Sequence, residues 1–188
     1  MAEHVCPWWL GYFLASPLRR IWQEPHHILA PHVREGMTVL EPGPGMGFFT
    51  LELARLVGPK GRIIAVDVQP KMLSVLAKRA KKAGVAERIL LREPVQDRMG
   101  IEEFGGQVDF VLAFAVVHEL PDMTTFFQEA ATAMKNGGRM LLAEPSGHVK
   151  AEAWSKTLLM ARKSGLKEEM QVVIPRSHAV VLTKGETI

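Results

Sequence analysis

Short apolar runs alternate with helical patterns along most of this chain. Strands are predicted where a mostly apolar run ends at an acid or a turn, over residues 38–41, 62–67, 88–92, 108–114 and 139–144. Helices are predicted over 47–57, 70–83, 122–134 and 150–164, with a short helix at 100–104. This alternation is typical of an α/β fold with a mainly parallel sheet.

The last part of the chain breaks the alternation. Two apolar runs, 170–174 and 179–183, are separated by Pro175-Arg176-Ser177, which is short enough for a hairpin. We therefore expect two paired strands after the last long helix. No internal repeat, low-complexity tract or second domain interrupts the pattern.

Composition narrows the class of protein. The chain has 188 residues, 47% of them hydrophobic and 23% charged, which suits one soluble domain with a sizeable core. No apolar run is long enough to span a bilayer, and the first residues lack the layout of a signal peptide. The single cysteine, Cys6, excludes an intramolecular disulfide and favours a reducing, cytoplasmic location. A net charge of +3 is too mild to make nucleic acid an expected partner.

The turn after the first predicted strand carries glycines at alternate positions, Gly43, Gly45 and Gly47. Such a turn lets the backbone approach a ligand closely, because a side chain at Gly43 or Gly45 would fill the space. Asp67 ends the next apolar run, about twenty residues further on, where a carboxylate is well placed to bind the two hydroxyls of a ribose. Together these features predict a nucleoside-containing cofactor.

The charge of that cofactor is indicated by Glu41. Dinucleotide folds use the spacing G-x-G-x-x-G, with the helix N-terminus facing a pyrophosphate, whereas this turn has G-x-G-x-G. A carboxylate two residues before Gly43 would repel a pyrophosphate but suits a cation such as an ammonium or a sulfonium.

The segment Glu41-Pro42-Gly43-Pro44-Gly45-Met46-Gly47 resembles motif I of the class I S-adenosylmethionine (SAM) methyltransferases, E/D-x-G-x-G-x-G, at every position. Segment 65–73 resembles the second conserved segment of that family, and segments 108–122 and 134–145 resemble its small-molecule branch. The nearest likeness is to the ubiquinone/menaquinone-biosynthesis methyltransferases and type 11-like methyltransferases. The resemblance covers roughly 33–184.

This resemblance implies a Rossmann-like three-layer sandwich with a seven-stranded, mostly parallel sheet and an antiparallel terminal strand, occupying 33–188. It implies SAM as the cofactor and S-adenosyl-L-homocysteine (SAH) as the product. The residues that it carries over to cofactor binding are Glu41, Gly43, Pro44, Gly45, Gly47, Asp67, Val68 and Ala113.

The third strand is followed by a departure from the family pattern. Relatives often have Gly-Asp-Ala there, with the acid bonding the adenine amine, and Val95 aligns with that acid in this chain. Gln96 or Asp97 supplies the bond with a shift of one or two residues, or the backbone does. Alternatively, Asp97 simply caps the following turn.

His118 is the best candidate for a general base. Methyl transfer needs a base only if the acceptor loses a proton as it attacks, and the ordinary pKa of histidine lies near neutrality. The residues expected around the acceptor are those at the carboxyl ends of the later strands, 113–119, 144–148 and 175–177. The competing interpretation is that His118 caps or packs the following helix. Glu119, His148 and Arg176 are weaker candidates.

Residues 1–32 are predicted to form an N-terminal cap segment. Trp8, Trp9 and Tyr12 make its start aromatic, and a helical pattern covers 18–29. An aromatic lid would suit a planar or apolar acceptor. Packing onto the sheet, or onto a second copy in a homodimer, explains the same residues. No metal site is expected, because His26, His27 and His32 lack a recognised ligand spacing.

Three functions are compatible with these features. The first is a SAM-dependent methyltransferase acting on a small acceptor, apolar or aromatic. The second is an RNA or protein methyltransferase, against which stands the absence of an N/D-P-P-[YFW] motif at 113–116. The third is a SAM- or nucleotide-binding subunit without catalysis.

Overall fold

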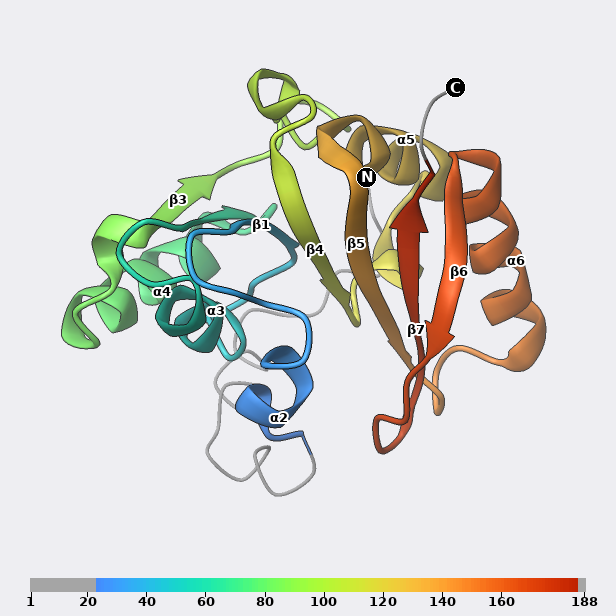
Figure 1. Cartoon of the computed structure of the whole chain (residues 1–188), viewed down its shortest axis with the longest axis horizontal. Helices are drawn as coiled ribbons and strands as arrows, with labels where there is room; N and C mark the ends of the chain where they lie inside the picture. The colour runs from blue at the N-terminus through green and yellow to red at the C-terminus, as the bar shows by residue number, and fades with distance from the viewer. Residues whose placement is uncertain (1–22, 186–188) are drawn as a thin grey trace.

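The computed structural model describes residues 23–185, and the aromatic part of the predicted N-terminal cap lies outside them. A single sheet runs through the described chain in the order β3-β2-β1-β4-β5-β7-β6 (Figure 1). Its strands are β1 (Thr38–Pro42), β2 (Arg62–Val66), β3 (Ile89–Arg92), β4 (Val108–Phe114), β5 (Met134–Pro145), β6 (Leu166–Gln171) and β7 (Ser177–Lys184).

Strand directions match the predicted mixed sheet. The first five strands pair in parallel, and β7 pairs antiparallel with both β5 and β6. The helices of the described chain are α2 (Pro25–Leu29), α3 (Thr50–Leu56), α4 (Pro70–Lys82), α5 (Met123–Ala133) and α6 (Ala151–Lys163). The predicted Rossmann-like sandwich with seven strands is therefore confirmed.

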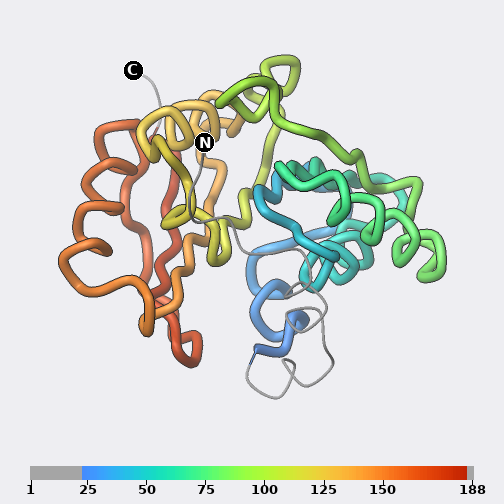
Figure 2. The backbone as a smooth tube through the Cα atoms, turned by 180° about the vertical axis from the view of Figure 1, so that it is seen from behind, coloured from blue at the N-terminus to red at the C-terminus, as the bar shows by residue number. Residues whose placement is uncertain are grey.

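Neighbouring residues of each central strand enter different hydrophobic cores. Leu40 and Val111 belong to the core beneath α5 and α6, while Val39 and Phe110 belong to the core beneath α2, α3 and α4. This division follows from the alternation of side chains along a strand. Because both faces of the sheet are covered, the central strands read as continuous apolar runs in the sequence. Figure 2 shows the two ends of the sheet from behind, with the α3–α4 region on one side and α6, β6 and β7 on the other.

Helix ends follow the local chemistry of the chain. Pro70 occupies the first turn of α4, and Gly84 follows its end with a φ of +69°. Asp122 caps α5, since its carboxylate accepts from Thr124 N at 2.8 Å and from Thr125 N at 3.2 Å. The helix predicted from 47 begins only at Thr50, because Gly47 has a φ of +84° and cannot continue a right-handed helix.

Two strand boundaries differ from the prediction. β5 begins at Met134 rather than at 139, and the register with β4 shifts between Val108 and Phe110. Gly137, with a φ of +71°, lies inside that irregular stretch, so residues that read as a turn are a bulge within the strand.

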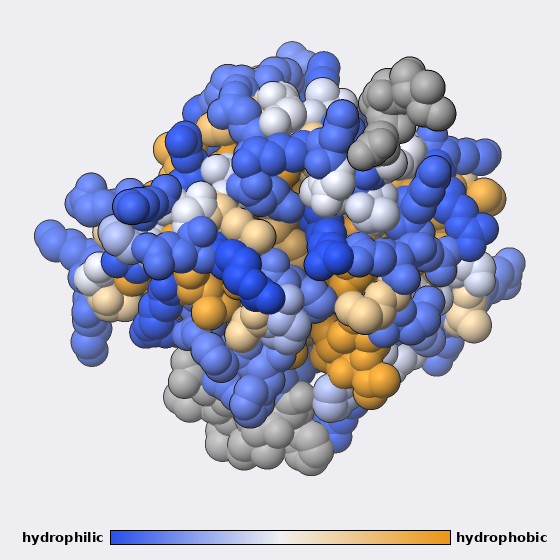
Figure 3. Space-filling model, viewed as in Figure 1, coloured by the Kyte–Doolittle hydropathy of each residue, from blue (hydrophilic) through white to orange (hydrophobic). Residues whose placement is uncertain are grey.

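β6 also lies earlier than predicted, at Leu166–Gln171 instead of 170–174. It is an edge strand with mostly exposed, charged side chains, so it lacks the apolar run that marks a central strand. The apolar residues that follow it form the turn to β7, where Val173 is 97% exposed. Figure 3 shows apolar surface gathered near that turn. In the described part of the chain, no helix is both long and apolar enough to cross a membrane.

Candidate active site

The glycine turn joins β1 to α3 at the carboxyl end of the sheet. Gly43, Gly45 and Gly47 all have positive φ, and Gly43 N donates to Val66 O at 2.8 Å. A Cβ atom at Gly43 would lie 2.8 Å from Val116 Cγ2, and one at Gly47 would clash with the side chain of Leu76. A Cβ atom at Gly45 would meet no atom of the described residues within 4 Å. At Gly43 and Gly47 the turn therefore packs tightly against other residues, and at Gly45 it borders open space.

This geometry refines the interpretation of the glycines. At Gly43 a side chain is excluded by the loop after β4, which packs against this glycine through Val116, and the contact of Gly43 with the cofactor stays a prediction. Gly45 alone borders open space, so it is the glycine at which the backbone can approach a ligand.

Asp67 is tied to the glycine turn. Its Oδ2 accepts from Gly45 N at 3.0 Å, and its Oδ1 accepts from Gln69 N at 2.9 Å. The side chain is 8% exposed, and burial raises its pKa, although the two backbone donors oppose the rise. The carboxylate is thus held in a fixed direction beside the open side of the turn.

Glu41 is a buried carboxyl group with an unsatisfied oxygen. The residue is 3% exposed, and no group of the described chain hydrogen-bonds its Oε2. Burial raises the pKa of Glu41 to about 8, and the nearby charge of Asp67 adds to the rise. The Thr50 hydroxyl opposes it, although Thr50 Oγ1 lies outside hydrogen-bond geometry with the carboxyl.

A buried acid without a partner is costly for a protein, so its retention calls for a reason. A cationic ligand would both supply the missing hydrogen bond and stabilise the ionised form of Glu41. The carboxylate of Glu41 therefore fits the cationic end of SAM, whose ammonium can donate the hydrogen bond and whose sulfonium adds positive charge, and Gly45 leaves room for the cofactor.

The loops after β2 and β3 expose apolar side chains where the adenine was expected. Val68 is 58% exposed and Val95 is 63% exposed. Gln96 has a φ of +56°, in a tight turn closed by two hydrogen bonds between Val95 and Arg98. Asp97 is in the same turn, and its assignment to the adenine amine stays a prediction, as does that of Gln96.

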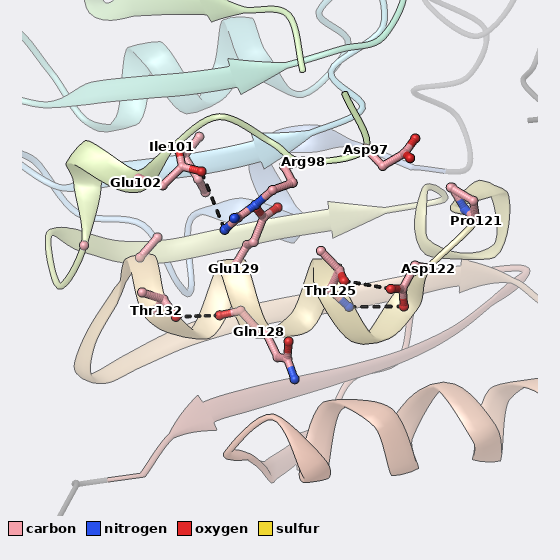
Figure 4. Close-up of a pocket in the computed structure, with 12 residues that line it drawn as sticks. Asp97, Arg98, Ile101, Glu102, Pro121, Asp122, Thr125, Gln128, Glu129 and Thr132 are labelled. Atoms are coloured by element: carbon pink, nitrogen blue, oxygen red, sulfur yellow. Dashed lines mark hydrogen bonds and ion pairs between the residues drawn. The ribbon is translucent and has the colours of Figure 1, made fainter. Parts of the chain in front are cut away.

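A groove of about 600 Å³ lies between this turn and α5 (Figure 4). Of the predicted cofactor residues, only Asp97 lines it. Arg98 Nε pairs with Glu129 Oε1 at 2.7 Å, and Glu129 Oε2 accepts from Met99 N at 2.9 Å. Because these charges satisfy one another, the groove anchors the turn to α5 and is not the centre of the site.

His118 and Glu144 meet at the ends of β4 and β5. His118 follows β4 on the short 3₁₀ helix Val117–Glu119, and its Nδ1 contacts Glu144 Oε2. Glu144 is 1% exposed, and its Oε1 accepts from Val117 N at 2.8 Å. Ala113, the last predicted cofactor residue, is fully buried in β4. From the sequence, Glu144 was expected near the acceptor, without a specific role.

The surroundings of His118 are mainly acidic. The Glu144 carboxylate raises the pKa of His118, burial opposes this rise, and Glu119 adds to it. Glu119 Oε1 lies 3.9 Å from His118 Nε2, and the ring of His148 packs edge-on with centroids 6.4 Å apart. His118 thus has Nδ1 held by the Glu144 carboxylate and Nε2 near the Glu119 carboxylate, and its side chain is 25% exposed.

His26 and His32, two other histidines considered in the sequence, make contacts that hold the fold together. His32 is 8% exposed and stacks on Phe110 with ring centroids 5.8 Å apart. His26 Nδ1 bonds Glu52 Oε1 at 2.8 Å and so ties α2 to α3. The described residues contain no group of three or more potential metal ligands.

Residues 33–177 match the model of a protein family that is described as a methyltransferase domain. The arsenite methyltransferase of Aquipseudomonas alcaligenes is 28% identical, over 62% of this chain and 35% of its own length. The ribosomal protein L11 methyltransferase of Pelotomaculum thermopropionicum is 33% identical, over 61% of this chain and 34% of its own length. The ubiquinone/menaquinone biosynthesis C-methyltransferase UbiE of Pasteurella multocida is 27% identical, over 70% of this chain and 48% of its own length. The chain spans about half the length of these relatives or less.

The same fold occurs in a solved structure of similar size. A SAM-dependent methyltransferase from Aquifex aeolicus superposes with a TM-score of 0.84, covering 96% of this chain and all of the other. Its sequence is 22% identical, so the likeness concerns the fold.

Proposed function

The chain belongs to the methyltransferase domain family, and we propose that it transfers the methyl group of SAM to a small-molecule acceptor. The observation that carries this proposal is the unsatisfied, buried carboxyl of Glu41 beside the open turn at Gly45. An anionic dinucleotide would place like charges together there, whereas a sulfonium cofactor supplies the missing cation.

Each predicted cofactor residue has a distinct task in this proposal. Glu41 binds the cationic end of the cofactor, and Asp67 binds the ribose hydroxyls. Val68 and Val95 border the adenine through their exposed apolar side chains, with Gln96 or Asp97 as its polar contact. Residues 113–116 separate the cofactor from the acceptor side, since Val116 packs on Gly43.

Bound SAM supplies an electrophilic methyl group on a positively charged sulfur. The chain's part is then to hold donor and acceptor in line and to exclude water. The small-molecule acceptor is supported by the names of two relatives, an arsenite methyltransferase and a ubiquinone/menaquinone biosynthesis C-methyltransferase.

A protein acceptor is the second candidate, because one relative is named a ribosomal protein L11 methyltransferase. The segment Ala113-Phe114-Ala115-Val116 argues against amine methylation, since its side chains offer no polar group to a planar amine. Labelled methyl transfer from SAM to ribosomal protein L11, with none to small acceptors, would select this candidate.

The cofactor is tested by isothermal titration with SAM, SAH and NADH. We expect micromolar binding of SAM and SAH and none of NADH; binding of NADH alone would refute the proposal. Gly45→Ala should weaken SAM binding, because the new Cβ enters the open space. Gly84→Ala is the matched control, since Gly84 has a similar positive φ and equally open surroundings but lies after α4.

A further inference from the structure

One histidine of the site is fixed by a buried carboxylate. Glu144 is at the end of β5, is 1% exposed, and uses one oxygen for Val117 N and the other for His118 Nδ1. A buried carboxylate is tolerated only when its oxygens are satisfied. Here the backbone of the 3₁₀ helix and the imidazole ring satisfy them together.

This contact decides which nitrogen of His118 carries the proton. A carboxylate only accepts hydrogen bonds, so Nδ1 must be the donor and carry the hydrogen. In the neutral ring Nε2 then keeps its lone pair. The hydrogen bond from Val117 N already holds the 3₁₀ helix, so packing alone does not explain the second contact.

His118 is also connected to the cofactor side of the site. Val116, two residues earlier, packs directly on Gly43 of the glycine turn, and Ala115 takes a φ of +55° to make that approach. The connection from the glycine turn to the imidazole is therefore short. The side chain of His118 is 25% exposed, and its Nε2, which Glu144 does not hold, lies 3.9 Å from Glu119 Oε1.

We propose that His118 Nε2 removes a proton from the acceptor and that Glu144 is the residue that positions it. The acceptors of this enzyme then carry a dissociable proton on the atom that is methylated, as phenols and enols do. This inference rests on the proposed methyltransferase function and narrows its substrate class.

The step balances without another reactant. A lone pair of the acceptor atom bonds to the methyl carbon, and the methyl–sulfur bond breaks with its electron pair going to sulfur. The acceptor's proton passes to His118 Nε2, and the imidazolium is stabilised by Glu144. That proton leaves to water through the exposed edge of the ring. A base of this kind contributes about 100-fold to 10,000-fold in rate.

The pH dependence follows from the groups that face His118. These are Glu144 from β5, Glu119 from its own 3₁₀ helix and His148 from the loop after β5. Since Glu144 raises the pKa of His118, turnover should increase with pH through that raised value as the ring loses its proton. Glu144→Gln should move this acid limb to lower pH.

Nuclear magnetic resonance tests the pairing without any acceptor. In ¹⁵N spectra of the SAH complex we expect the His118 ring in the Nδ1–H form, assigned with His118→Gln. In Glu144→Gln the amide N–H can donate to Nδ1, so we expect the Nε2–H form and a lower pKa. An Nε2–H ring in the unaltered protein, or a pKa that Glu144→Gln does not change, would overturn the proposal.

Glu129→Gln is the matched control. Glu129 is also buried, and it too accepts from one backbone N–H and one side-chain N–H, but its partners are Met99 and Arg98. Glu129→Gln should lower thermal stability about as much as Glu144→Gln does, while leaving the ¹⁵N spectrum of His118 unchanged. Equal effects of both variants on His118 would indicate a general structural role.

The substrate class is tested with catechol and hydroquinone as protic probes and arsenite as a probe whose lone pair attacks directly. We expect methyl transfer to a protic probe, with turnover reduced about 100-fold or more by His118→Gln. Transfer to arsenite alone, or to no probe, would count against the class. Titration with SAH separates the outcomes, because intact SAH binding leaves the proposed cofactor site standing when the acceptor inference fails.

Discussion

Binding of SAM should expel a proton from Glu41. The pKa of this buried acid is raised to about 8, so at pH 7 about 0.9 of the free protein carries the proton there. A cation placed against the unsatisfied Oε2 favours the ionised form and lowers that pKa. Each binding event at pH 7 should then release about 0.9 proton, provided that the pKa in the complex falls well below 7.

The same linkage sets the affinity. The fraction of free protein with an ionised Glu41 is about 1 in 100 at pH 6 and about 1 in 11 at pH 7. The association constant for SAM should therefore increase about ninefold over that interval. The α-amino group of the ligand stays protonated there, since its ordinary pKa is about 7.7 to 8.0.

Isothermal titration at pH 7 in buffers of different ionisation enthalpy measures the released protons as the slope of observed enthalpy against buffer enthalpy. Glu41→Gln should abolish that slope and weaken binding. A flat dependence in the unaltered protein would refute the reasoning about Glu41. An unchanged slope in Glu41→Gln would assign the proton to another group, such as Asp67 or His118.

Three further predictions concern single residues. Because the pKa of Glu41 in the folded chain, about 8, exceeds its ordinary 4.5, its contribution to stability is full below pH 4.5 and is lost as the pH rises through 8. Glu41→Gln should consequently raise Tm more at pH 9 than at pH 5 in calorimetric scans, and equal shifts would contradict this. Asp67→Ala should weaken SAM binding by about one to two decades, or roughly 1.5–3 kcal/mol, and unchanged affinity by calorimetry would exclude the ribose role. Phe127→Ala, at a fully buried position, should cost about 3–5 kcal/mol of unfolding free energy in urea while SAM affinity in the folded protein is retained.

The sequence predicted the central part of the fold well because those strands are buried on both faces. The predicted limits of β4 coincide with the observed ones, and those of β1 and β2 differ by one residue. The edge strand β6 was misplaced because its pairing with β7 depends on backbone hydrogen bonds, while its charged side chains carry no apolar signal. The start of β5 was missed because the bulge at Gly137 has the local conformation of a turn.

The cofactor half of the candidate site could be predicted from the sequence more fully than the His118–Glu144 half. The glycine turn and Asp67 lie on adjacent strands with a fixed spacing, so a local pattern describes them. His118 and Glu144 are 26 residues apart, and they meet because β4 and β5 run in parallel, with Phe114 paired to Ala143. A general rule, that carboxyl ends of neighbouring parallel strands share one edge, points to such pairs but does not decide which side chains turn toward each other.

Hydrogen bonding is the property that separates the roles of the two glutamates, and it arises only in the folded chain. Glu41 and Glu144 both end a strand and both are nearly inaccessible to water. Glu144 receives a hydrogen bond from the backbone and one from His118, so the chain itself satisfies it. Glu41 keeps an oxygen that no described group satisfies, and we expect a bound cation to be its partner. In our proposal the same residue type positions a base at one strand end and binds a cation at the other, and titration with SAM should perturb Glu144 only weakly.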